Sequence, residues 1–494
     1  MIRKIAILAL SLGLFAYSFL SCRHEPFDQE KGNFPAEVSR ILIYKCANEG
    51  CHDAAGAVNA AKLRLDSWEE LFKGSSHGAV VVPYSTKYST LLYYVNQESH
   101  SNNDIVAIPS MPYNATALTE EEYNALKSWI ANGAPDAAGN IPFADNPDTR
   151  QKIYMTQQQC EDLVTVIDAK SGQVMRYIPI GIEPGRTEVA HNVKFSPDGQ
   201  YAYVCFVEGT VIQKLDVKTD KVMGSVAIGS GGWNVIYLSP DGKKLLVSDL
   251  NNNLMVKVNA ESMTIDEVYD AGFKYAHGIA ASPSFDTMYI TSQNTNIVYR
   301  FIPNDLVEPI FPIYLEGDEE IMGYREGNTN PHEIVMSADN KKLFVTCENT
   351  HEVRVIDIAT NEITTISVGI RPKEMTVWKK KNWLFVTCID DINTSTAKAR
   401  GSVYVIDMNT LQKVGSPIYG DFYMPHGITV DEQHDRLYIA SENLGIDGPA
   451  PHHSSGCDGR NGWYNIYDLN TLRPVNNIRY EVTPDPYGLD ARFK

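Results

Sequence analysis

Tyr289-Ile290-Thr291-Ser292 is one of seven similar four-residue strands along the chain. Each copy opens with two apolar residues, continues with a small one, and follows the previous copy after about 40 to 55 residues. The copies begin at Tyr154, Tyr203, Leu246, Tyr289, Phe344, Phe385 and Tyr438. Several short strands repeating at this period are typical of β-propeller blades. The propeller fold supports many different functions, so we expect this one to depend on residues on one face and in the central channel.

Two further strands accompany each copy. The strand before it ends in a tight turn, as in the Ser-Pro-Asp-Gly sequences at 196–199 and 239–242, where proline and glycine suit a short hairpin. The strand after it ends in an acidic residue, as in Val166-Ile167-Asp168 and Val355-Ile356-Asp357. Apolar residues alternate with period two, which predicts half-buried strands.

The number of innermost strands predicts the number of blades. These strands begin near His191, Trp233, His277, His332, Lys373, His426 and Tyr487. The last one ends the chain, whereas the first repeat, from Ile153 to Ile180, has no innermost strand before it. We therefore expect seven blades, closed by pairing of the first and last strands, which removes sheet edges. In this pattern residues 152–494 resemble YVTN-type propellers.

The amino-terminal residues have the features of a targeting segment. Arg3 and Lys4 precede an apolar run from Ile5 to Leu20, which is short for a membrane span. Phe19-Leu20-Ser21-Cys22 resembles a bacterial lipobox, and the resemblance implies lipidation of Cys22 and a membrane anchor in the cell envelope, facing the periplasm or the surface. The alternative is an ordinary cleaved signal peptide.

Charge and cysteine content limit the partners. The 494-residue chain has a net charge of −18, which disfavours nucleic acid as a partner and direct adsorption to anionic lipid. Of its eight cysteines, Cys160 and Cys457 fall in corresponding loops of neighbouring blades, on one face. An oxidising compartment permits a disulfide between them, although spacing alone does not decide the pairing.

One motif carries specific chemistry. In Cys46-Ala47-Asn48-Glu49-Gly50-Cys51-His52, two thiols could attach a heme covalently and His52 could ligate its iron. The common motif has two residues between the cysteines, whereas this one has four. The alternative is a short disulfide loop with His52 as a bystander.

The surroundings of the motif favour heme. Apolar residues at helical spacing precede it from Ala36 to Lys45, and a capped helix opens at Leu118-Thr119-Glu120. With Met111-Pro112 and the final Trp129-Ile130, residues 36–136 resemble planctomycete-type cytochrome c domains. The resemblance implies a small all-α domain with one heme c, attached to Cys46 and Cys51.

The same resemblance implies Met111 as the second axial ligand, opposite His52. A thioether ligand stabilises reduced iron, and two filled axial positions suit electron transfer. The alternatives are that Met111 only fills the core, and that His77 or His100 is the ligand.

Histidines recur at the start of the innermost strands. We expect His191, His277, His332 and His426 to ring one mouth of the channel, with Trp233, Lys373 and Tyr487 in the other blades. The long loop from Asn443 to Gly462 adds His452 and His453 on the same face. Converging imidazoles could bind a second metal or cofactor. The alternative is inherited repeat structure without a ligand.

These inferences give one predicted organisation. Residues 1–21 form a lipoprotein signal, 22–35 a tether, 36–136 the heme domain, 137–151 a linker and 152–494 the propeller. The predicted function is single-electron transfer by a lipid-anchored monoheme c-type cytochrome, with the propeller docking a redox protein partner. The alternatives are an oxidoreductase with its active site at the histidine-lined mouth, and a surface binding propeller without redox chemistry.

Overall fold

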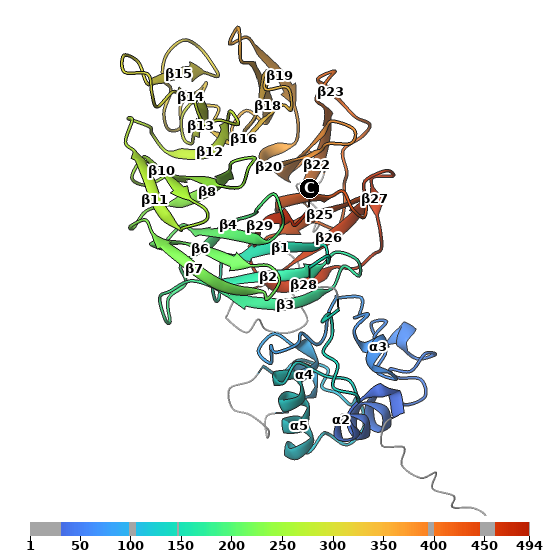
Figure 1. Cartoon of the computed structure of the whole chain (residues 1–494). Coiled ribbons are helices and arrows are strands. Elements are labelled where there is room, and N and C mark those ends of the chain that lie inside the picture. Colours follow the sequence, from blue (N-terminus) through green and yellow to red (C-terminus); the bar gives the residue numbers. More distant parts are fainter. Residues whose placement is uncertain (1–30, 98–104, 146–147, 394–399, 445–459, 494) are drawn as a thin grey trace, which may run out of the picture.

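A seven-bladed β-propeller makes up most of the chain (Figure 1). The computed structural model describes residues 31–97, 105–145, 148–393, 400–444 and 460–493. Neighbouring strands pair antiparallel within seven sheets of four or five strands. This confirms the seven blades expected from the repeat.

The innermost strands form a closed ring, because each contacts the innermost strand of the next blade. They are β29 (Pro486–Ala491), β4 (Ala190–Phe195), β8 (Trp233–Leu238), β12 (Ala276–Ala281), β16 (Pro331–Met336), β20 (Ile370–Trp378) and β24 (Pro425–Asp431). The second strands, which carry the repeated sequence, are β1 (Lys152–Gln157), β5 (Tyr201–Phe206), β9 (Lys244–Asp249), β13 (Met288–Ser292), β17 (Lys342–Cys347), β21 (Trp383–Asp390) and β25 (Arg436–Ser441).

Exposure rises at the outermost strand of the blade, as in β7, β11 and β19. The third strands are β2 (Leu163–Asp168), β6 (Val211–Asp216), β10 (Leu254–Asn259), β14 (Ile297–Phe301), β18 (Glu352–Asp357), β22 (Ser402–Asp407) and β26 (Asn461–Asp468). The outermost strands are β3 (Val174–Pro179), β7 (Lys221–Ala227), β11 (Thr264–Tyr269), β15 (Ile310–Tyr314), β19 (Ile363–Ser367), β23 (Gln412–Lys413) and β27 (Arg473–Pro474), and β28 (Tyr480–Pro484) also pairs with β26.

The two ends of the propeller region meet in one blade, as predicted. Strand β29 pairs antiparallel with β1, with Leu489 opposite Met155 and Ala491 opposite Ile153. All four side chains are buried, at 5% exposure or less. Closure therefore covers the edge of β1 with an apolar strand from the other end of the chain.

The turns follow the predicted chemistry. In the turn after β4, Ser196 donates to Asp198 at 2.5 Å, and Gly199 has a φ of +68°, which a residue with a side chain rarely adopts. After β18, Asp357 accepts hydrogen bonds from the backbone of Ala359 and Thr360. The acidic residue that ends the third strand thus fixes the turn to the outermost strand.

The expectation of a separate small all-α cytochrome c domain is wrong. The described chain is nearly all β, and its α-helices are α2 (Ala36–Ile41), α3 (Trp68–Leu71), α4 (Thr90–Val95) and α5 (Glu120–Ala131), of 6, 4, 6 and 12 residues. The 3-10 helices η1 (Lys31–Asn33) and η3 (Ala57–Asn59) and the π-helix η2 (Leu42–Cys46) are equally short. Turns and loops make up the rest of the described part of residues 31–145, which we call the amino-terminal segment.

The amino-terminal segment is also not independent of the propeller. Val82, which is 2% exposed, lies in the same buried cluster as Ile153 and Leu489 of the closing blade. The apolar side chains of the helices pack on one another in a core of the segment, and Val82 and the partly buried Ala79 add a contact with the closing blade. No helix in the described ranges is long and apolar enough to cross a membrane.

Candidate functional site

The motif residues lie in a closed loop at the end of a helix. Helix α2 continues as η2, which ends at Cys46 as the sequence predicted. The backbone N–H of His52 donates to the carbonyl oxygen of Cys46 at 3.2 Å, and that of Cys51 donates to Asn48 at 2.9 Å. These bonds bring both cysteines and His52 into one turn of chain.

Both thiols are free, so the structure does not contain the alternative disulfide loop. Cys46 is 6% exposed and belongs to the apolar core of the amino-terminal segment, and burial raises the pKa of its thiol to about 12. Cys51 is exposed. One thiol therefore faces apolar side chains while the other lies at the surface of the loop.

His52 is held by its Nδ1 atom. This nitrogen lies 3.1 Å from the carbonyl oxygen of Leu63, and the N–H of Leu65 donates to the His52 carbonyl oxygen at 2.9 Å. Burial lowers the pKa of His52, which favours the neutral imidazole. An Nδ1–H donated to a carbonyl leaves the Nε2 lone pair for a metal, the usual arrangement of a ligating histidine.

Met111 packs against the same apolar core as Cys46. Its backbone N–H donates to the carbonyl oxygen of Tyr94 at 2.7 Å. The other candidate ligand, His77, lies at the propeller, where its carbonyl oxygen accepts from the N–H of Glu481 at 3.0 Å. His100 lies outside the described residues.

The channel mouth carries the predicted ring of histidines, with one correction. Trp233 is not in the ring. It pairs with Asp249, and the equivalent pair in the next blade is Ala276 with Ser292. Trp233 therefore corresponds to Ala276, the residue before the ring residue His277. The ring residue of the blade with Trp233 is therefore Asn234. It lies 12 residues before Leu246, as His277 lies 12 residues before Tyr289, so the spacing to the repeated strand was the available signal. The ring consists of His191, Asn234, His277, His332, Lys373, His426 and Tyr487.

The ring side chains stack on one another. The His277 and His332 ring centroids lie 4.3 Å apart, and His426 stacks on Tyr487 at 3.8 Å. Tyr487 also contacts His191, at 4.5 Å. All four histidines are buried, at 7% exposure or less. Burial lowers the pKa of His191 to about 4 and lowers those of His277 and His426 as well.

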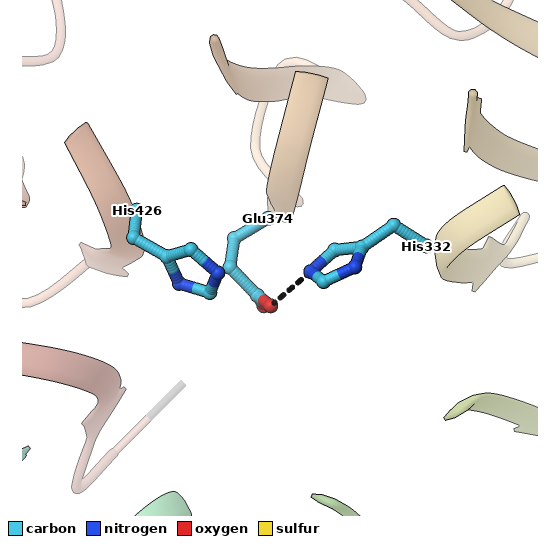
Figure 2. A group of neighbouring side chains, drawn as sticks. All are labelled: His332, Glu374 and His426. Atoms are coloured by element: carbon cyan, nitrogen blue, oxygen red, sulfur yellow. Dashed lines mark ion pairs between the residues drawn. The ribbon is translucent and has the colours of Figure 1, made fainter. Parts of the chain in front are cut away.

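Buried charges lie beside the ring, and sequence reasoning missed them. Nδ1 of His332 is 3.4 Å from Glu348, and its Nε2 is 3.6 Å from Glu374, too long for a hydrogen bond (Figure 2). Lys373 pairs with Glu348 at 2.8 Å. Glu374 follows directly after the ring residue Lys373, so its place after a ring position was the available signal.

The buried glutamates beside the ring differ in their charge at neutral pH. Burial and the neighbouring Glu374 raise the pKa of Glu333 to about 8. Burial would also raise the pKa of Glu374, but His332 and Lys194 lower it to about 2. Burial lowers the pKa of His332, and the two carboxylates of Glu348 and Glu374 outweigh that effect and raise it. At neutral pH the centre of the ring therefore contains the Glu374 carboxylate.

Other predicted site residues are only partly described. Cys160 is disulfide-bonded, but Cys457 lies outside the described residues, so their pairing stays a prediction. His452, His453 and the lipidation residue Cys22 also lie outside them.

Comparisons support the fold alone. No protein-family model and no curated protein matches the sequence. A solved structure titled as a functionally unknown protein from Desulfotomaculum acetoxidans DSM 771 is similar with a TM-score of 0.51 and 13% identity, over 69% of this chain and 98% of that chain. Kuenenia stuttgartiensis hydrazine synthase is similar with a TM-score of 0.44 and 18% identity, over 62% of this chain and 91% of that chain.

Proposed function

We propose that the loop from Cys46 to His52 carries one covalently attached heme c and that the protein transfers single electrons. The observation that carries this proposal is the contact between Nδ1 of His52 and the Leu63 carbonyl oxygen, at 3.1 Å. It orients the imidazole as a ligating histidine is oriented, directly after two free thiols.

The donor set fits a heme better than a bare metal ion. Cys46 lies among apolar side chains, whereas Cys51 is exposed, so the two thiols could hold a flat apolar group with one edge at the surface. Met111, packed against the same core, would be the second residue to hold the iron in this proposal. When bound, such a group carries one electron at a time, and two filled axial positions leave no site for oxygen.

The remaining parts of the chain have supporting roles in this proposal. Lipidation of Cys22 anchors the protein in the bacterial envelope, and the propeller docks a redox protein partner. The heme site sits on a loop-rich segment that is packed against the closing blade through Val82. Docking on the propeller therefore also positions the redox group.

The test is expression of the full chain in cells that attach heme to c-type cytochromes. We expect the mass of one heme on the mature protein and a sharp reduced α band in the visible spectrum. His52→Ala should lose the low-spin spectrum, whereas Met111→Ala should keep the covalent heme and lower the reduction potential. His77→Ala is the matched control and should change neither.

Two results would overturn the proposal. An unmodified polypeptide mass in such cells would remove heme and leave a binding propeller. An unchanged potential in Met111→Ala would remove Met111 from the iron while leaving the attachment in place.

A further inference from the structure

Three side chains from three successive blades converge at the channel mouth. His332 comes from β16, Glu374 from β20 and His426 from β24. One ligand atom from each lies within 4.8 Å of the other two, and Figure 2 shows the three side chains pointing toward one another. Two imidazoles and one carboxylate are a common donor set for divalent transition metals.

His426 differs from the other ring histidines in its hydrogen bonds. Nδ1 of His191 contacts the Asn234 carbonyl oxygen at 2.8 Å, Nδ1 of His277 contacts that of His332 at 3.0 Å, and Nδ1 of His332 lies 2.6 Å from the Gln293 amide. Both ring nitrogens of His426, and Nε2 of His332, are buried without a hydrogen-bond partner. Buried polar atoms without a partner are rare and costly, so these three nitrogens require an explanation.

The Glu374 carboxylate interacts electrostatically with His332 and Lys194. Lys373 directly precedes Glu374 in the sequence, but it pairs with the Glu348 carboxylate, at 2.8 Å. The Glu374 oxygen and the His332 Nε2 stay 3.6 Å apart, which is too long for a hydrogen bond between them. An ion seated among the three groups would bind a Glu374 oxygen and two of the three nitrogens, Nε2 of His332 and one ring nitrogen of His426.

Neighbouring groups hold the His332 side chain and the backbone of Glu374 and His426 in place. The side-chain amide of Gln293 lies 2.6 Å from Nδ1 of His332, and Glu348 lies 3.4 Å from the same atom. Either the Glu348 carboxylate or, with the amide turned over, the Gln293 oxygen can accept the Nδ1–H, which leaves Nε2 free to ligate. The Thr387 hydroxyl accepts from the Glu374 N–H at 3.1 Å and donates to the His426 carbonyl oxygen at 2.8 Å.

We propose that the propeller channel holds one divalent transition-metal ion on His332, Glu374 and His426. The imidazoles are neutral, so the Glu374 carboxylate cancels only one of the two charges of the ion. The other acidic groups beside the site suit the remaining positive charge. Three protein ligands leave a coordination position for water or a small oxygen-containing molecule in the channel, as in catalytic rather than structural metal sites. The site is independent of the proposed heme.

The test is equilibrium dialysis of the full-length protein against Zn²⁺, followed by elemental analysis, which distinguishes zinc from heme iron. We expect one tightly bound zinc per chain. Glu374→Gln and His426→Gln both nearly conserve side-chain size. Glu374→Gln removes the charge of the carboxylate, and His426→Gln removes an imidazole ligand. Each should weaken zinc binding by more than about tenfold. His191→Asn is the matched control, because it changes a ring histidine whose Nδ1 already has a partner.

Thermal unfolding of each variant without added metal checks that the propeller still folds. Zinc should also raise the unfolding temperature of the wild-type protein and of His191→Asn, but not of Glu374→Gln or His426→Gln. No tight zinc in the wild-type protein, or equal binding in the folded Glu374→Gln variant, would overturn the site. Neither result would bear on heme attachment.

Discussion

The third residue of the repeated strand explains why the repeat is visible in the sequence. The hydroxyl of Thr291 donates to the His332 carbonyl oxygen at 2.8 Å and accepts from the Gly278 N–H at 2.7 Å. The same bond to the ring residue of the next blade is made by Thr156, Ser248, Thr346 and Thr387, and by the Cys205 thiol at 3.4 Å. This small polar residue therefore ties six of the seven blades to the next, whereas the seventh copy has Ala440 at this position and lacks the bond.

Removing that hydroxyl should weaken the joint between two blades. Thr291→Val conserves the shape but leaves the buried N–H of Gly278 without its acceptor, which should lower the free energy of unfolding by about 1–3 kcal/mol. Denaturant unfolding measures the loss. Thr264→Val, on the exposed strand β11, is the control and should change the stability by less than about 0.5 kcal/mol. Equal effects of the two substitutions would contradict the role of the hydroxyl.

A buried ring histidine makes the stability depend on pH. Burial lowers the pKa of His191 to about 4, whereas an unfolded chain has a histidine pKa of about 6.5. Between these pH values the unfolded state binds more protons, so the free energy of unfolding falls as the pH drops from about 6.5 to about 4. His191→Asn should reduce this loss by up to about 3 kcal/mol, since Asn234 already fills the equivalent position. An identical pH profile for the variant would show that His191 does not remain neutral in the fold.

At the scale of strands, burial divides each blade into an inner and an outer part. Leu489 on β29 is 5% exposed, whereas Val268 on β11 is 55% exposed. Leu489→Ala leaves a cavity beside Met155 and should cost about 2–4 kcal/mol of unfolding free energy. Val268→Ala should cost less than about 0.5 kcal/mol. A small cost at Leu489 would mean that pairing of β29 with β1 contributes little to closing the propeller.

The elements also show how far sequence reasoning reaches. Period-two alternation and turn residues predicted the strands and the closure, because both are local signals that each blade repeats. The position of Asn234 was missed because the large apolar Trp233 was aligned with the histidines, although Asn234 has their spacing of 12 residues to the repeated strand. Glu374 was missed because only its place after the ring residue Lys373 marks it in the sequence, whereas its proximity to His332 and His426 comes from three different blades.

At the scale of the whole molecule, the amino-terminal segment has an apolar core of its own and shares a second buried cluster with the propeller. The helical patterns predict the apolar faces of the segment but do not reveal that it also contacts the propeller. This contact runs through Val82, the bond between Glu481 and the His77 carbonyl oxygen, and the bond from Gln173 to the Lys73 carbonyl oxygen at 2.7 Å. The segment and its proposed redox group are thereby held at one side of the propeller (Figure 1).

This shared core predicts that one substitution will release the segment. Val82→Asp buries an unpaired carboxylate among Ile153, Leu489 and their neighbours, so the contact should open to solvate the charge. The amide proton of Glu481 then loses its partner on His77, and its exchange with solvent should become at least about tenfold faster, while small-angle scattering shows a larger particle. Val58→Asp, at a position that is 71% exposed, adds the same charge to the segment and should change neither measurement. If the Glu481 amide stays protected in Val82→Asp, the segment is held by contacts other than this core.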